Sequence, residues 1–483
     1  MKKQSKTNIA KSNGLTNKFE KLYTTNLNEL SEIEIEKICM RILLIGSIAK
    51  LIYSLIVPCN ISRHDLGFIS DWKTIENGHL GYIQYIYQYK HLPDFSPEGM
   101  VQFYHPPFFY IVSAILMGIT MMFETNVIFA FDVIQVFVTL IAIYTTMLLF
   151  VMAKKIGIKG RNLVFLATFF SFCPIFYILG VTLNNDMLMI MLSVLAMYFT
   201  LCWCENHSLK NIIGIAISMG LAMMTKTSAG IIAPAIGFVF LHELIVNKNM
   251  RKKLIIQFVL FGIICVPLGM FWAIRNNVLY GIPFNYVFDP KSDEMYLGYH
   301  TLIDRIGLPS IYELFGYRID ISQTDKYYNI WGQTMMTMVF DEGILSIKSI
   351  PEWVMGILMM WSSTILYIMG LVSTVKGIVD KKININRRIL FIISFWSVFI
   401  SYIIFCFKYP YICTMNFRYI VITLVSGMMM LGLMENNKQC MKANNKKKSI
   451  TTVLFNLCVI VTSICSFILF IVCAESQYKY KNV

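Results

Sequence analysis

Long apolar runs separated by short polar segments dominate the pattern along this chain. Stretches such as 42–58, 254–273, 389–407 and 450–473 have about the ~20 residues that a helix needs to cross a bilayer core. These runs are too long and too uniformly apolar for the alternating strands of a membrane barrel, so they predict helices. The pattern predicts eleven membrane-spanning helices, at roughly 40–58, 127–152, 162–182, 187–204, 211–225, 228–246, 254–273, 352–375, 389–407, 417–434 and 450–474.

One further apolar stretch, 106–122, does not fit this series. It follows two prolines in "FYHPPFFY", which end any preceding helix and can start a new one. A full crossing here would move every later basic loop to the other side of the membrane. We therefore expect 106–122 to dip into the membrane and return, or to lie at its interface.

The basic residues favour one orientation of this arrangement. The N-terminal segment and the loops on its side carry 27 Lys and Arg residues, against 14 on the other side. Because basic loops stay in the cytoplasm, the amino terminus should be cytoplasmic and the carboxyl terminus outside. The expected division is a cytoplasmic segment 1–38, a membrane domain 39–474 with long outer loops 59–105 and 274–351, and an outer tail 475–483.

Composition supports a multi-pass membrane protein and narrows its partners. Hydrophobic residues make up 56% of the 483 positions and charged residues 14%, too few for a water-facing globule. The net charge of +14 lies in short loops, so we expect membrane lipids and no nucleic acid as partners.

The 12 cysteines show no C-x-x-C pair and are interpreted as small hydrophobes. Residues 1–38 contain no apolar core of a removable signal peptide. Lys50, in the middle of a span, should face protein or water.

Two acidic residues stand at outer helix ends. Asp65 follows the first predicted span directly, beside His64 in "SRHDLG", and Asp186 lies in "LNNDML" at the outer end of a later span. Either carboxylate could simply cap a helix. Two carboxylates from different spans at one interface favour a shared cleft, and we treat both as candidate catalytic residues.

Two cations are expected at the same interface. Lys226 lies in the outer turn of "GLAMMTKTS", and Arg418 begins a span in "MNFRYIV". Cations at this depth suit a lipid phosphate, although each could instead be a snorkelling anchor. His64 and His105 are further candidates for binding substrate or lipid phosphate. The histidines of the first outer loop match no metal-ligand spacing, so no metal is expected.

These motifs occur in an order that resembles the GT-C membrane glycosyltransferases. The order is an acidic residue after the first span, "HPPFFY", "NND", "G-L-A-x-x-T-K", "R-N-x-x-x-Y-G-x-P" and a late "R-Y". It is most similar to glycosyltransferase family 39, the dolichyl-phosphate-mannose protein mannosyltransferase-like family, and its bacterial aminoarabinose-transferase-like relatives. The resemblance covers about residues 40–290 and then "FRYI". It implies a GT-C-like, all-α fold with interfacial helices in the first outer loop.

The resemblance also implies an activity in the cell membrane. A polyprenyl-phosphate sugar donor would transfer its sugar to an acceptor hydroxyl of a glycan, lipid or protein at the outer face, without a cofactor. Asp65 would be the catalytic carboxylate, Asp186 would bind the acceptor or stabilise charge on the sugar, and Lys226 and Arg418 would hold the phosphate. The sequence departs from many relatives at two places. Tyr104 and His105 stand beside the prolines, where many relatives carry a charged residue, and Asp132 stands where an arginine is common.

Two other functions remain open from the residues alone. A secondary transporter or lipid flippase would place ionisable groups near the middle of the membrane and show repeat symmetry, which we do not detect. A polysaccharide polymerase or ligase would use a large outer loop, and "WGQTMMTMVFDEG" within 274–351 keeps that reading open.

Overall fold

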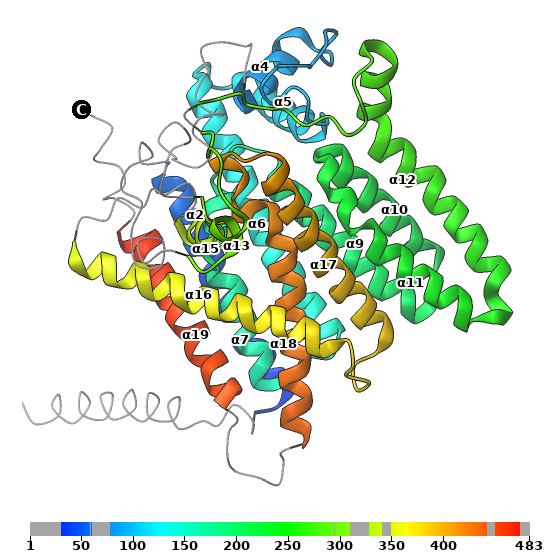
Figure 1. Ribbon diagram of the computed structural model, residues 1–483, viewed down its shortest axis with the longest axis vertical. Coiled ribbons are helices and arrows are strands. Elements are labelled where there is room, and N and C mark those ends of the chain that lie inside the picture. The colour runs from blue at the N-terminus through cyan, green and yellow to red at the C-terminus, as the bar shows by residue number, and fades with distance from the viewer. Residues whose placement is uncertain are drawn as a thin grey trace, which may run out of the picture.

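The computed structural model describes residues 30–57, 59, 78–293, 295–309, 328–340, 349–441 and 450–473, and these form helices without a β-strand (Figure 1). The elements are α2 (Glu32–Ile56), α4 (Gly78–Tyr89), α5 (Phe108–Met121), α6 (Val127–Lys155), α7 (Gly160–Phe172), α8 (Pro174–Gly180), α9 (Asp186–Asn206), α10 (Leu209–Thr225), η1 (Thr227–Ile232), α11 (Ala233–Val246), η2 (Lys248–Met250), α12 (Arg251–Tyr280), α13 (Leu302–Ile306), α15 (Ile330–Phe340), α16 (Ile350–Gly377), α17 (Ile385–Lys408), η4 (Ile412–Thr414), η5 (Phe417–Ile420), α18 (Val421–Met441), α19 (Ile450–Phe467) and η6 (Ile468–Val472).

Within these residues, ten helical segments are long and apolar enough to cross a membrane. They coincide with ten of the eleven predicted spans. The eleventh, 211–225, is α10, an apolar helix of 17 residues that packs between α9 and α12. On α12, side chains such as Ile255, Val259 and Ile263 are exposed, as expected of a face turned to lipid. The prediction of an all-α, multi-pass membrane protein is confirmed.

The first helix begins earlier than its apolar run. We expected a span from about residue 40, whereas α2 begins at Glu32. Ser31 accepts a hydrogen bond from the backbone of Glu34 through its hydroxyl, and the Glu34 carboxylate accepts one from Ser31 N at 2.9 Å. This capping box starts the helix about two turns earlier, in a segment where charged residues alternate with isoleucines.

Contacts between helix ends show which ends lie together. At one end, the Lys154 ammonium lies 2.6 Å from Glu36 and the Lys159 ammonium lies 2.6 Å from Glu32. Arg387 donates to the carbonyl oxygen of Ile156 at 2.7 Å. The start of α2, the end of α6 and the start of α17 are therefore neighbours, with the basic loop 153–161 among them.

The opposite end contains the beginning of α6. Gln135 Nε2 donates to the carbonyl oxygen of Val57 at 2.7 Å, and Thr139 Oγ1 donates to that of Gly180 at 2.7 Å. The chain thus leaves α2 and enters α6 at the same end. Helix α5 has 14 residues, about 21 Å, which is shorter than a bilayer core, and it lies beside α4 at this end in Figure 1. This geometry agrees with a segment 106–122 that makes no net crossing.

Lys50 lies inside the bundle, as the sequence predicted. Its side chain is 2% exposed, and Nζ donates to the carbonyl oxygen of Ser171 at 2.5 Å and lies 5.1 Å from the centre of the Tyr177 ring. Its partner on α7 is a backbone carbonyl. The lysine therefore joins α2 to α7 within the apolar core.

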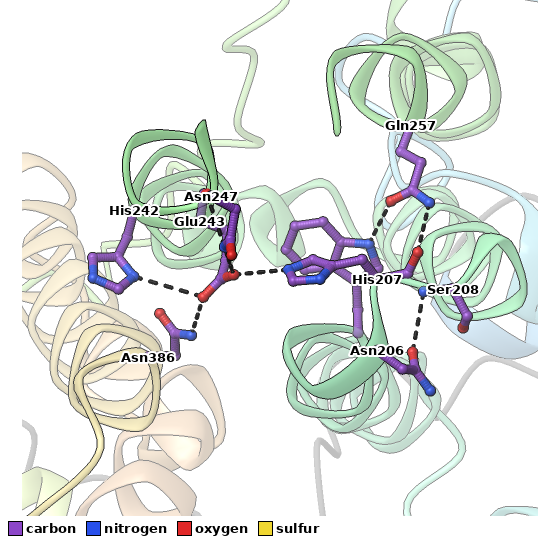
Figure 2. A network of polar contacts seen from close by, with 9 residues as sticks. Asn206, His207, Ser208, His242, Glu243, Asn247, Gln257 and Asn386 are labelled. Carbon is purple, nitrogen blue, oxygen red and sulfur yellow. Dashed lines mark hydrogen bonds and ion pairs between the residues drawn. The ribbon is translucent and has the colours of Figure 1, made fainter. Parts of the chain in front are cut away.

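A buried carboxylate joins four helices at the basic end of the bundle (Figure 2). Glu243 of α11 is 6% exposed. Its Oε2 lies 2.7 Å from His207 Nε2 and accepts from Asn247 Nδ2 at 2.6 Å, while Oε1 accepts from Asn386 of α17. The backbone of His207 in turn accepts from Gln257 Nε2 of α12 at 2.8 Å. We refer to these five residues as the Glu243 cluster, and it ties α9, α11, α12 and α17 together.

Candidate active site

A cavity of about 520 Å³ opens at the end of the bundle opposite the Glu243 cluster. Its walls come from segments far apart in the sequence: the turn before α5, the start of α9, η1, the end of α12, the segment after it, the end of α17 and η5. Of the six candidate site residues, four line this cavity: His105, Asp186, Lys226 and Arg418. The other two, His64 and Asp65, lie outside the residues that the structure describes.

Three of the lining residues form a buried cluster of charge. Lys226 Nζ donates to Asp186 Oδ1 at 2.5 Å, and Arg418 Nε lies 3.9 Å from Asp186 Oδ2. The exposed fractions of Asp186, Lys226 and Arg418 are 2%, 9% and 7%. Two cations share one carboxylate, so this charge cluster carries a net positive charge and suits an anion at the cavity wall.

The start of α9 places Asp186 in this cluster. Asn184 Oδ1 accepts from Asp186 N at 3.0 Å, and Asn185 Nδ2 donates to the carbonyl oxygen of Thr225 at 2.9 Å. The second bond holds the start of α9 against the end of α10, next to Lys226. Asp186 is the first residue of α9, and its carboxylate lies against both cations.

Tyr419 lies against the charge cluster, although the sequence did not predict it as a site residue. Lys226 Nζ lies 5.1 Å from the centre of its ring and Arg418 Cζ lies 5.2 Å from it, so both cations contact one aromatic ring. Arg418 also donates to the Tyr419 hydroxyl at 3.3 Å. The only sequence signal for this tyrosine was its place in the late "R-Y" pair.

The histidine side of the cavity belongs to the loop 59–105, the first predicted outer loop. The rings of His79 and His105 are stacked with centres 6.3 Å apart, and His79 Nδ1 lies 2.9 Å from the Tyr110 hydroxyl. Trp272 Nε1 of α12 donates to the carbonyl oxygen of Tyr104 at 3.1 Å, which fixes this loop to the bundle. Over the described part of the chain, no three His, Cys, Asp or Glu side chains lie close enough together to hold a metal.

The segment after α12 covers one side of the cavity. It begins at Gly281, whose φ of +70° suits glycine, and its Phe288 ring stacks on Tyr104 with centres 5.7 Å apart. Asp289 Oδ1 accepts from the Tyr411 hydroxyl at 2.6 Å. This hydrogen bond lowers the pKa of Asp289 and raises the pKa of Tyr411 to about 12. The covering segment is thereby attached to the turn that precedes Arg418.

The comparisons with known proteins agree with this architecture. Residues 104–272 match the family model of dolichyl-phosphate-mannose-protein mannosyltransferase, a region that includes His105, Asp186 and Lys226. No curated protein matches the sequence.

Two similar solved structures are crystal structures of the oligosaccharyltransferase of Archaeoglobus fulgidus. One is tethered with an acceptor peptide, at 14% identity and a TM-score of 0.51, covering 92% of this chain and 55% of that one. The other is a complex with Zn and sulfate, at 13% identity and a TM-score of 0.50, covering 90% and 53%. The chain thus spans about half the length of these proteins, and the likeness is one of fold. The family match over residues 104–272 and this likeness of fold both agree with the motif order of the sequence.

Proposed function

We propose that this protein transfers a sugar from a polyprenyl-phosphate-linked donor to an acceptor hydroxyl at the outer face of the cell membrane. The observation that carries the proposal is the charge cluster of Asp186, Lys226 and Arg418 in the wall of the cavity. The family match supports a glycosyltransferase of this type. The acceptor class stays open among a glycan, a lipid and a protein.

The charge of the cluster suits this donor. A sugar joined to a lipid through one phosphate carries a single negative charge, and the cluster carries one cation in excess. Charge-assisted hydrogen bonds from Lys226 and Arg418 would hold the phosphate and stabilise the charge that grows on it as it leaves. This arrangement supplies the positive charge from side chains, and we propose no metal or other cofactor.

The proposed reaction forms one bond and breaks another at the anomeric carbon of the donor sugar. The acceptor oxygen attacks this carbon, the bond from the carbon to the phosphate oxygen breaks, and polyprenyl phosphate leaves. We assign the acceptor proton to Asp65 as the general base. Asp186 would orient the two cations and stabilise positive charge on the sugar, and His64 and His105 would contact the substrate.

The first experiment tests the phosphate role of Arg418. Replacing it with alanine removes a charge-assisted contact worth about 1.5–3 kcal/mol, so the apparent affinity for the lipid-linked donor should fall by roughly 10- to 150-fold. The measurement is donor binding to the purified protein in detergent. Lys408→Ala provides a control, because this exposed cation near the end of α17 does not line the cavity. An unchanged donor affinity in Arg418→Ala would exclude the phosphate role, and donor binding without any transfer would favour a flippase.

The second experiment tests the orientation, with the amino terminus in the cytoplasm and the carboxyl terminus outside. Single cysteines introduced near residues 95 and 320 should react with a membrane-impermeant reagent in intact cells. Cysteines near residues 157 and 445 should react only after the cells are opened. The basis is the basic loop 153–161, which lies at the end of the bundle away from the cavity. Labelling of position 157 from outside would reverse the orientation and place the cavity in the cytoplasm.

A further inference from the structure

Helix α15 lies in the predicted outer loop 274–351 but packs inside the bundle. It has 11 residues, roughly 16 Å, and lies against α8, α16 and η5. Its residues from Gly332 to Thr334 and from Met336 to Phe340 are buried. The segment "WGQTMMT" therefore forms a short inserted helix, and its position raises the question of what it supports.

Two hydroxyl groups on one face of α15 bond to two walls of the cavity. Thr334 and Thr337 are three residues apart, which places them on the same side of the helix. The Thr334 hydroxyl lies 2.6 Å from that of Tyr402, a cavity residue of α17. Thr337 Oγ1 accepts a hydrogen bond from the backbone N–H of Phe417 at 2.9 Å and donates to the carbonyl oxygen of Thr334 at 3.0 Å. The exposed fraction of each threonine is 1%.

The bond from Phe417 fixes the backbone next to Arg418. Phe417 is the first residue of η5 and is fully buried, and Arg418 follows it. The neighbouring N–H of Arg418 donates to Asn416 Oδ1 at 3.0 Å. Since η5 is a single 3₁₀ turn, the two hydrogen bonds at its start determine where the guanidinium group leaves the chain.

We propose that Thr337 is a positioning residue for Arg418, and that α15 holds the lipid-phosphate site in its binding geometry. This inference rests on the proposed function, because it assigns the phosphate to Arg418. The inference gives the loop 274–351, which contains α15, a role in the site that binds the donor phosphate. The hydroxyl is required because the group must accept from Phe417 while it donates within its own helix. Valine has nearly the same shape and offers no acceptor, so it leaves a buried N–H unpaired.

The test compares the binding of polyprenyl phosphate to purified variants. Thr337→Val should weaken binding by about three- to tenfold, the equivalent of one hydrogen bond, and Thr337→Ser should restore it. The matched control is Thr145→Val. Thr145 is equally buried and donates at 2.7 Å to Ile141 in its own helix, far from η5 in the chain. If Thr337→Val fails to fold, Thr337→Ala gives the same comparison, because alanine also removes the hydroxyl that accepts from the Phe417 N–H.

A double-mutant cycle separates positioning from general destabilisation. If Thr337 acts through Arg418, then Thr337→Val should have almost no further effect on binding in the Arg418→Ala background. Equal losses in both backgrounds, or unchanged binding in Thr337→Val alone, would overturn the inference. Failure of the proposed function has a different signature, in which Arg418→Ala binds polyprenyl phosphate as tightly as the wild-type protein.

Discussion

Replacing Asp65 with asparagine should lower the rate of sugar transfer by roughly 10²-fold or more. Asparagine keeps the size and the hydrogen-bonding groups of the side chain but cannot take up the acceptor proton, and general-base catalysis contributes on the order of 10²–10⁴ in rate. Folding and donor binding should change little, because asparagine caps a helix as well as aspartate does. The measurement is turnover of the purified variant with saturating donor.

The result distinguishes catalysis from capping. Asp94→Asn is a suitable control, since this carboxylate belongs to the same loop, accepts from the Tyr85 hydroxyl at 3.0 Å and does not line the cavity. It should transfer sugar at close to the wild-type rate. Near-normal turnover in Asp65→Asn would make this residue a helix cap and remove the proposed base from the mechanism.

Replacing Asp186 with alanine should destabilise the empty protein by about 3–5 kcal/mol. The change leaves the buried ammonium of Lys226 without the carboxylate to which it donates, and an unpaired buried charge costs about this much. Thermal unfolding in detergent should show a lower midpoint. Polyprenyl phosphate should recover part of the loss, because its phosphate can take the place of the missing carboxylate.

A second substitution checks the cause of this loss. Combining Asp186→Ala with Lys226→Met removes the cation that has lost its partner, so the double variant should be more stable than Asp186→Ala alone. An unchanged unfolding midpoint in Asp186→Ala would mean that the carboxylate does not compensate the two cations. A double variant less stable than the single one would mean that the losses add independently.

Much of the fold could be predicted because membrane insertion requires long apolar runs. The apolar runs identified ten of the spanning segments. The basic loops identified which helix ends lie on the same side of the bundle, such as the start of α2 and the end of α6. The start of α2 was missed because charged residues interrupt the apolar pattern in its first two turns, which depend on a local cap at Ser31. The burial of α15 was also missed, since an 11-residue helix with a mixed surface gives no signal of what it packs against.

The candidate site could be predicted in part for a similar reason. Asp186, Lys226 and Arg418 were found because ionisable residues are conspicuous at the ends of apolar runs, and the structure brings them together. The aromatic partner Tyr419 and the supporting hydroxyl of Thr337 are common residue types in such segments. Their roles depend on contacts between spans, which no local pattern encodes.

The Glu243 cluster limits how the cavity can change its width. It joins α9, α11, α12 and α17 at one end, and these helices or the turns next to them form cavity wall at the other end. Along α17, Asn386 of the cluster and Tyr402 of the wall are separated by roughly 24 Å. We therefore expect relative movement of the four helices to pivot about their joined ends. The displacement grows with distance from that pivot, so the mouth of the cavity can open by tilting while the opposite face of the protein stays closed.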